Sequence, residues 1–332
     1  MKIWFPTIRA GSGVDVYVSR LAAALGKNGI STEISWFDRR FEFLPSLLQS
    51  KQPPAGTDII HANSWSAFAF KRENIPLVVT EHHCVLDPAL KTHKSHYQSI
   101  YHENIIKHYE QASFRRAQKV VAVSRYTASS LERTFDLSDV EVIYNWVDTE
   151  RFVPASSYSS NNEKFRLLFV GNQSARKGWD TIVRIMQALG DDFQLKATTG
   201  LGDRSQTGTN TNILPLGRLS DDDLVKAYQD CDALLFPSRY EGFGYAALEA
   251  MACGKPVIAS DNSALPEVVT DGITGVLCPP NDSQCFIAAC RKLKDNKTLR
   301  VELGKNARDR VLNNFSEEDL VQRYISVYKQ LL

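Results

Sequence analysis

The chain has 332 residues, of which 43% are hydrophobic and 10% aromatic, enough apolar material for two globular domains with separate cores. Its formal net charge of +1 gives no electrostatic basis for nucleic-acid binding. The six cysteines contain no Cys-x2-Cys pair, which argues against a disulfide framework and a zinc ribbon. The scattered cysteines suit a reducing cytosol, and no apolar run reaches the roughly 18 residues of a membrane span. We therefore expect a cytoplasmic protein, which could make peripheral contact at the inner face of a membrane.

Short apolar runs alternate with helical patterns through the first half of the chain. This alternation is typical of an α/β protein whose parallel sheet carries helices on both faces. The first strand is expected to break at Pro6, and a helix is expected over 14–25. The predicted strands of this half are 3–5, 31–36, 58–61, 76–80 and 120–124.

A polar run at 156–162 interrupts the alternation, which then resumes. We therefore predict a first domain over 1–152 and a second over 153–317, both Rossmann-like, with ligands at the carboxyl ends of the strands in a cleft between them. The final segment, 316–332, has helical spacing. Predicted strands of the second half are 167–170, 193–197, 213–216, 233–237 and 256–260, and predicted helices are 179–189, one starting near 220, and 245–253.

The turn after the first strand contains Gly11 and Gly13 and opens the first predicted helix, as a phosphate-binding turn does. It is not a dinucleotide fingerprint, because the last glycine of G-x-G-x-x-G is replaced by Val16. Gly13 remains a candidate for close approach to a phosphate group, and a purely structural turn is the alternative.

No metal site is predicted. All seven histidines lie between His61 and His108, but they do not share one helical face with acidic partners. The acidic run 221–223 follows Ser220, and carboxylates after a serine are typical of a helix start, where they complement the dipole.

Residues 91–119 mix Lys, Arg and His with aromatic side chains and contain few acids. Such a segment fits a surface that faces a membrane or an acceptor. An ordinary amphipathic helix with a solvated basic face explains it equally well.

The most informative run is 236–256, which sets Glu241 and Glu249 around a glycine turn. Gly244 allows the backbone to make a tight turn. The residues from Tyr245 onward favour a helix, which is expected to end at a Gly-Lys-Pro sequence. The backbone N–H groups of Phe243, Gly244 and Tyr245 would therefore point from a helix N-terminus, which favours an anion such as a diphosphate. Glu249 lies about 7.5 Å further along the helix, a separation that suits the ribose of a nucleotide.

Arg176 and Lys177 follow a predicted strand and precede a predicted helix, at the same end of the second domain. An Arg fork and a Lys point charge can together neutralise a departing diphosphate without a metal. A solvated basic loop is the alternative.

The run from Pro237 to Ser260 resembles the donor-site signature of glycosyltransferase family 4, retaining enzymes of the GT-B fold. The resemblance implies two Rossmann-like domains facing across a cleft, with a C-terminal helix, about 318–332, that crosses back to the first domain. It also implies a metal-independent transfer from a nucleotide-sugar donor, held by the second domain, to a carbohydrate or lipid-linked acceptor on the first, in bacterial cell-surface polysaccharide or glycolipid synthesis.

The same resemblance assigns roles to other residues of the second domain. Lys177 and Gly178 match the end of the family's Gly-Arg-x4-Lys-Gly element, whose Arg position is Asn172 here, so that Arg176 is the substitute cation. Glu241 would orient the sugar hydroxyls. The backbone around Gly217 and Arg218 would lie near the base.

In the first domain, the segment around Gly13 is similar to the family's Gly-Gly-x-Glu, with Ser12 and Asp15 as departures. Thr80-Glu-His82 is similar to the family's Thr-x-His, whose histidine contacts the transferred sugar. His83 competes with His82 for that role.

Two other functions fit the same fold. One is an isomerase or phosphorylase, such as a nucleotide-sugar epimerase, which would need no second substrate. A non-catalytic sugar-nucleotide binding protein is the third possibility, although the presence of Lys177, Glu241 and Glu249 argues against it. The donor base, the sugar and the acceptor are not specified by the sequence.

Overall fold

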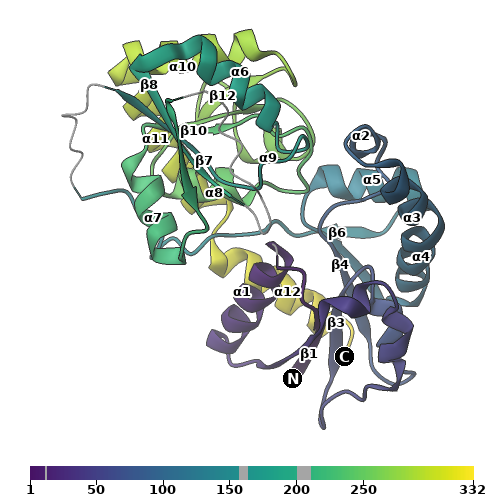
Figure 1. The fold of residues 1–332 in the computed structure, drawn as a ribbon. Helices are drawn as coiled ribbons and strands as arrows, with labels where there is room; N and C mark the ends of the chain where they lie inside the picture. Colours follow the sequence, from purple (N-terminus) through teal and green to yellow (C-terminus); the bar gives the residue numbers. More distant parts are fainter. Residues whose placement is uncertain (12, 157–163, 200–210) are drawn as a thin grey trace. The chain divides into compact units, whose positions relative to one another are not determined.

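A computed structural model describes residues 1–332 except 12, 157–163 and 200–210. The chain forms two compact units, which Figure 1 shows in ribbon form. Unit 1 contains Met1–Asn145 and Glu317–Leu332, and unit 2 contains Trp146–Ser316. Within the described residues, no helix is long and apolar enough to cross a membrane.

Unit 1 is built on a six-stranded parallel sheet with the order β2-β1-β3-β4-β5-β6. The alternating apolar runs thus form a parallel α/β sheet, as predicted. The strands are β1 (Lys2–Ile8), β2 (Ser31–Phe37), β3 (Ile59–Asn63), β4 (Leu77–Glu81), β5 (Lys119–Ala122) and β6 (Val140–Val142). The α-helices are α1 (Gly13–Lys27), α2 (Pro88–Lys91), α3 (His96–Tyr101), α4 (Lys107–Arg116), α5 (Arg125–Phe135) and α12 (Glu317–Gln330), with short 3-10 or π segments η1 (Arg39–Glu42), η2 (Pro45–Ser50), η3 (Ala67–Ala69) and η4 (His102–Ile106).

The expected break at Pro6 is wrong, because β1 continues through it to Ile8. Pro6 is in register with Ser35 of β2, while β1 pairs with β3 only at Ile3 and Trp4. Proline lacks a backbone N–H and is tolerated in a strand where no ladder bond is needed on that side. At Pro6 the β3 side of β1 carries no pairing, so the strand can run on.

The C-terminal helix α12 packs on unit 1, which confirms that it returns to the first domain. Its buried face includes Tyr324 and Tyr328. The Tyr17 hydroxyl donates to the Tyr324 hydroxyl at 2.9 Å, and the Tyr328 hydroxyl lies 2.6 Å from Nδ1 of His61. Burial lowers the pKa of His61 to about 3, so this ring is neutral and acts as a structural hydrogen-bonding group.

Unit 2 has a second six-stranded parallel sheet, with the order β12-β11-β10-β7-β8-β9. Its strands are β7 (Phe165–Phe169), β8 (Phe193–Thr198), β9 (Ile213–Gly217), β10 (Ala233–Phe236), β11 (Val257–Ser260) and β12 (Gly275–Cys278). Its helices are α6 (Trp179–Leu189), η5 (Gly190–Asp192), α7 (Asp221–Asp230), α8 (Tyr245–Ala252), α9 (Leu265–Val268), α10 (Ser283–Asp295) and α11 (Lys297–Asn314).

The strand order of unit 2 reverses between β7 and β10. The chain passes from β7 outward through β8 to β9, and then returns to place β10 on the other side of β7. In open parallel sheets, ligands bind at the carboxyl ends of the strands where the order reverses. The loops after β7 and β10 are therefore adjacent, although they are far apart in sequence.

Residues 146–152, expected in the first domain, belong to unit 2. The Phe152 ring packs edge-on against Tyr228, with centroids 6.1 Å apart. The Arg308 guanidinium donates to the carbonyl oxygens of Phe152 at 2.7 Å and Thr149 at 2.9 Å. These contacts are between segments far apart in sequence, so local patterning did not reveal them. Most of the predicted linker, 157–162, lies outside the described residues.

Candidate functional site

The loops that follow β7 and β10 bring three of the predicted residues together. Nζ of Lys177 lies 2.6 Å from Oε1 of Glu241. The Ser238 hydroxyl donates to the same carboxylate oxygen at 2.6 Å. Arg176 is further away, with Nη1 3.9 Å from Oε1 of Glu241, and it donates to the Tyr240 carbonyl at 3.0 Å. Two cations and one carboxylate thus converge at the switch point of the sheet.

Charge pairing outweighs burial at Glu241. Burial raises the pKa of this carboxyl, but the charges of Lys177 and Arg176 and two hydrogen bonds lower it, and the net direction is downward. Burial lowers the pKa of Lys177, partly opposed by the Glu241 charge. The pair is therefore a buried carboxylate and ammonium that stabilise each other's charged forms.

Two glycines let these loops approach each other closely. Gly178 has φ 74°, and a Cβ atom there would lie 2.1 Å from the carbonyl oxygen of Pro237. Gly244 has φ 107° and precedes α8, and its Cβ would lie 2.9 Å from a methyl carbon of Leu265. Both positions need the left-handed backbone that glycine adopts without strain.

The remaining predicted residues of the 236–256 run lie around the start of α8. The Phe243 ring is buried against Phe315, with centroids 5.8 Å apart, so only its backbone remains for a ligand role. The ring of Tyr245 lies edge-on to that of Phe243. Glu249 is buried on α8, where Oε2 accepts a hydrogen bond from the Tyr228 hydroxyl at 3.1 Å.

Gly217 and Arg218 lie at the carboxyl end of β9, and β8 separates this strand from β7. The Gly217 carbonyl accepts from the backbone N–H of Thr199 at 3.1 Å, and Arg218 is exposed. They share the carboxyl edge of the sheet with Lys177, which follows β7.

In unit 1, His82 and His83 both line a cavity of about 260 Å³. Nε2 of His82 lies 3.0 Å from the side-chain oxygen of Asn63, and its ring is edge-on to Tyr17 at 4.6 Å. Burial, followed by the charges of His83 and His61, lowers the pKa of His82 to about 3, so the ring is neutral near pH 7. His82 and His83 therefore both remain candidates for contact with the transferred sugar.

Gly13 is the first residue of α1, directly after the turn that ends β1. The positive φ of this turn, 65°, belongs to Gly11. The Asp15 carboxylate closes the turn by accepting from the N–H groups of Ala10 at 3.0 Å and Gly11 at 2.9 Å. Asp15, which stands where the family has glutamate, thus has a structural role in this turn. Ser12 lies outside the described residues.

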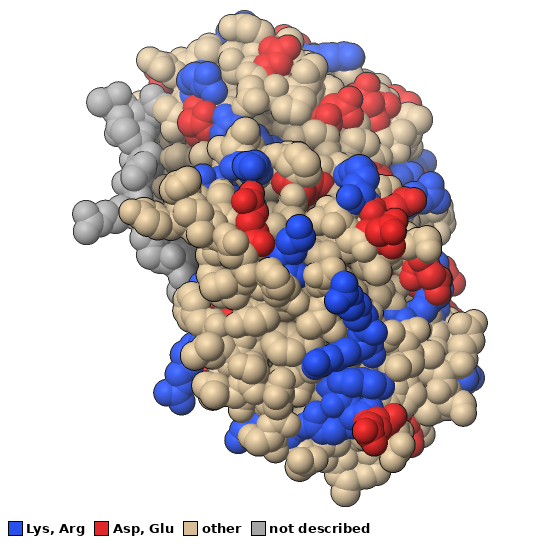
Figure 2. Space-filling model, turned by 90° about the vertical axis from the view of Figure 1, so that its right-hand side faces the viewer, with Lys and Arg blue, Asp and Glu red and all other residues tan. Residues whose placement is uncertain are grey.

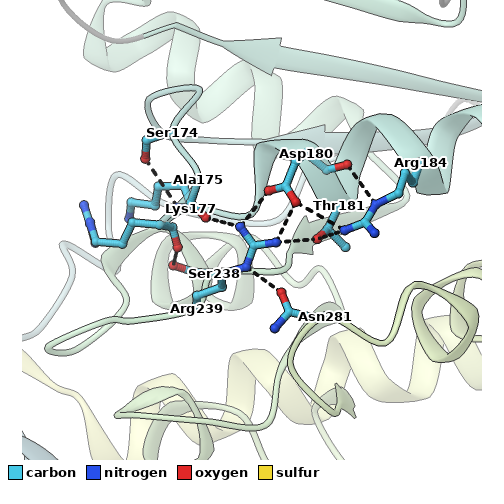
Figure 3. A network of polar contacts seen from close by, with 10 residues as sticks. Ser174, Ala175, Lys177, Asp180, Thr181, Arg184, Ser238, Arg239 and Asn281 are labelled. Atoms are coloured by element: carbon cyan, nitrogen blue, oxygen red, sulfur yellow. Dashed lines mark hydrogen bonds and ion pairs between the residues drawn. The ribbon is translucent and has the colours of Figure 1, made fainter. Parts of the chain in front are cut away.

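Sequence reasoning missed Arg239, whose guanidinium holds the two loops together (Figure 3). It pairs with both oxygens of the Asp180 carboxylate, at 2.6 and 2.7 Å. It also donates to the carbonyl of Ala175 and to the side-chain oxygen of Asn281. No motif marks Arg239, although its position between Ser238 and Glu241 was a signal.

Replacement of Arg239 by Ala should lower the free energy of unfolding by about 1–3 kcal/mol, because a side chain that is only 10% exposed loses several charge-assisted hydrogen bonds at once. Arg184 provides the matched control, since it also pairs with Asp180 but its side chain is 55% exposed, against 10% for Arg239. Arg184→Ala should cost less than about 1 kcal/mol. Urea denaturation of the two variants checks this, and equal losses would contradict the role of Arg239.

The acidic run 221–223 begins α7, as predicted from Ser220. The Ser220 hydroxyl accepts from the backbone N–H of Asp223, and Arg151 pairs with Asp221 and Asp222. Over the described parts of the chain, no group of three or more His, Cys, Asp or Glu side chains is arranged to hold a metal ion.

Comparisons with known proteins cover both units. A family model described as "Glycosyltransferase Family 4" matches residues 33–151, and one described as "Glycosyl transferases group 1" matches 155–310. A curated relative from Methanocaldococcus jannaschii, described as an uncharacterized glycosyltransferase, is 32% identical over 219 residues, which are 65% of this chain. The chain spans 60% of that relative's length.

Solved structures share the whole fold. The sucrose-phosphate synthase of Thermosynechococcus elongatus superposes with a TM-score of 0.84 at 21% identity, covering 99% of this chain and 98% of the other. Anabaena HepE, solved with UDP and glucose, gives 0.79 at 18% identity, covering 99% of each chain. The two parallel sheets and the returning C-terminal helix are those of the GT-B fold.

Proposed function

The chain belongs to glycosyltransferase family 4, and we propose that it moves a sugar from a nucleoside diphosphate sugar to a hydroxyl acceptor, with retention at the anomeric carbon. The observation that carries this proposal is the convergence of Lys177 and Arg176 on Glu241 at the switch point of unit 2. The cations are placed at the end of the sheet where a diphosphate would bind.

In this proposal, Lys177 and Arg176 stabilise the negative charge of the departing diphosphate, together with the backbone N–H groups of Phe243, Gly244 and Tyr245 at the start of α8. Glu241 orients the sugar hydroxyls and holds Lys177 in place through the 2.6 Å contact. Glu249 takes the ribose hydroxyls. The backbone of Gly217 and Arg218 faces the base.

Unit 1 binds the acceptor, a carbohydrate or a lipid-linked molecule, in the cavity beside His82 and His83. Gly13 approaches the phosphates of the donor. No metal takes part in the proposed transfer, because the cations supply the charge that phosphate release requires. The cellular role that we propose is synthesis of bacterial cell-surface polysaccharide or glycolipid, in the cytoplasm.

A thermal-shift screen of UDP-, GDP- and ADP-sugars tests the donor class. A bound donor stabilises the folded state by RT ln(1 + [L]/Kd), so the matching nucleotide should raise Tm and the others should not. UDP is the first choice because a neighbour of the same fold is described in complex with it. The absence of a shift with all three would contradict the proposal, and donor turnover without any acceptor would favour an epimerase.

Unit 1 also carries a surface suited to a membrane. The segment 91–119, basic in sequence, contacts the end of η1, since the Tyr101 hydroxyl donates to the Glu42 carbonyl and the Tyr101 ring packs near Phe43. Figure 2, turned toward the right-hand side of Figure 1, shows Lys and Arg side chains gathered in its lower part with few acids beside them. Apolar side chains are exposed within this segment, Tyr97 at 84% and Ile100 at 47%, and in the stretch around Phe43, with Phe43 at 62%, Leu44 at 54% and Leu47 at 61%. We propose that these exposed apolar side chains and the basic segment contact an anionic membrane surface.

The chain should therefore bind vesicles that contain phosphatidylglycerol and not neutral ones. Replacing Leu44 and Leu47 together by Ser should weaken this binding roughly tenfold, because apolar area no longer inserts. Leu312→Ser, a change at an exposed leucine of unit 2, is the control and should leave binding unchanged. Cosedimentation measures it, and equal behaviour of all three proteins would contradict the assignment.

A further inference from the structure

Two buried carboxyl groups meet behind the cavity of unit 1. Glu81, at the end of β4, and Glu110, in α4, are both almost fully buried. Their side chains lie within hydrogen-bonding distance of each other. Oε2 of each has no hydrogen-bond partner among the described residues. Hydrogen bonds from the Ser64 side chain and from the backbone of His82 and His83 lower the pKa of Glu81, against the larger effect of burial. Two carboxylates cannot hydrogen-bond to each other, so a hydrogen bond between them requires a proton on at least one of the two groups.

The other oxygens of the pair hold parts of the cavity wall. Oε1 of Glu110 accepts from the indole N–H of Trp65 at 2.9 Å, and Oε1 of Glu81 accepts from the backbone N–H of His83 at 3.1 Å. Trp65, Glu81, His82 and His83 all line the cavity of about 260 Å³. The pair thus links two parts of the cavity lining, the Trp65 side chain and the backbone of the histidine segment.

We propose that Glu81 and Glu110 share a single proton, and that this pair positions Trp65 and the His82–His83 backbone as the wall of the acceptor cavity. That the cavity takes the acceptor rests on the proposed function, whereas the shared proton does not. The two glutamates are positioning residues, because they act through Trp65 and His83.

The surroundings favour one proton over none. Burial raises the pKa of Glu81, and burial followed by the Glu81 charge raises the pKa of Glu110. The Lys94 charge acts in the opposite direction and lowers the pKa of Glu110, and the Lys94 Nζ donates to the Val85 carbonyl. The other titratable groups close by are Cys84, His83 and His102, the last with its ring edge-on to Trp65 at 5.8 Å.

Loss of the shared proton at high pH leaves two buried like charges side by side. Because the folded-state pKa values are raised, the stabilisation is present at low pH and is lost as the pH rises through them. Glu110→Gln removes this dependence and keeps the contacts, since an amide can accept from Trp65 and donate to the Glu81 carboxylate. We therefore expect the wild type to lose stability relative to Glu110→Gln as the pH rises.

The direct test follows the indole N–H resonance of Trp65 by NMR of the full chain, with Trp65→Phe providing the assignment. Between about pH 5 and pH 9, the wild-type resonance should shift with a midpoint well above the ordinary glutamate pKa of about 4.3. The shift should vanish in Glu110→Gln. It should persist in Glu103→Gln, a change at an exposed acid of η4, and in His102→Gln. A shift that persists in Glu110→Gln, or none in the wild type, overturns the shared proton.

Positioning is tested through the acceptor KM in the transfer assay. It should rise severalfold across the same pH range in the wild type and stay level in Glu110→Gln, with kcat little changed by the substitution. A level KM in the wild type, alongside the NMR shift, overturns the positioning role. Failure of the proposed function would show instead as no transfer with any donor, with the NMR titration intact.

Discussion

Lys177→Ala should lower kcat by roughly 10²–10³, the loss seen when one preorganised donor to a developing negative charge is removed. Nζ of Lys177 is held 2.6 Å from Glu241 and is largely buried, so its charge is little screened by solvent. Arg176 cannot replace it, because its Nη1 is 3.9 Å from the same carboxylate and is engaged by the Tyr240 carbonyl. Donor consumption at saturating donor and acceptor measures the effect.

Lys226→Ala is the control for this substitution. Lys226 is an exposed lysine of α7 that pairs with Asp223 in the same helix, so its removal should leave kcat unchanged. The melting temperature of Lys177→Ala must be followed as well, because the buried Glu241 carboxylate loses its closest cation. Turnover close to wild type in a folded Lys177→Ala protein would overturn the assignment of Lys177 to the diphosphate.

Gly178→Ala should lower the free energy of unfolding by about 2–5 kcal/mol, the sum expected for a left-handed backbone carrying a side chain and for overpacking. The added methyl would lie 2.1 Å from the Pro237 carbonyl oxygen, which is backbone and cannot rotate away. Because the two loops must then separate, the contact between Lys177 and Glu241 is expected to weaken, and activity to fall with stability. Urea denaturation and the donor assay measure the two effects.

The variant Gly272→Ala separates the effect of backbone strain from the effect of a steric clash. Gly272 has φ 68°, close to the 74° of Gly178, but a Cβ there would meet no atom within 4 Å. This control should cost about 1–2 kcal/mol from backbone strain alone and should leave donor consumption unchanged. If both alanine variants lose the same stability, close approach of the loops is not what requires glycine at 178.

Much of the fold could be predicted from the sequence, because helix and strand patterns are local. The helix expected at 179–189 is observed with the same bounds, and β11 at Val257–Ser260 differs from its prediction by one residue. Pro6 shows the limit of such reasoning. Whether a proline ends a strand depends on the pairing of its neighbours, and that pairing is set by the sheet.

The candidate site was predicted in part. Residue types and spacing singled out Lys177, Arg176 and Glu241, because cations and a carboxylate beside glycine turns suit a diphosphate sugar. Arg239 was missed, since its partner Asp180 is 59 residues away and no local pattern joins them. The pair of Glu81 and Glu110 was missed for the same reason, as its chemistry arises only when two carboxyl groups are buried together.

By itself, then, the sequence determined the alternation of strands and helices and the set of polar residues near strand ends, because both depend on neighbours along the chain. Only the tertiary structure decided which of those residues meet. Lys177 and Glu241 are 64 residues apart and come together because β7 and β10 are adjacent strands of one sheet. Burial is likewise decided by the tertiary structure. The shared proton of the glutamate pair and the neutral state of His82 depend on atoms that distant segments pack around them.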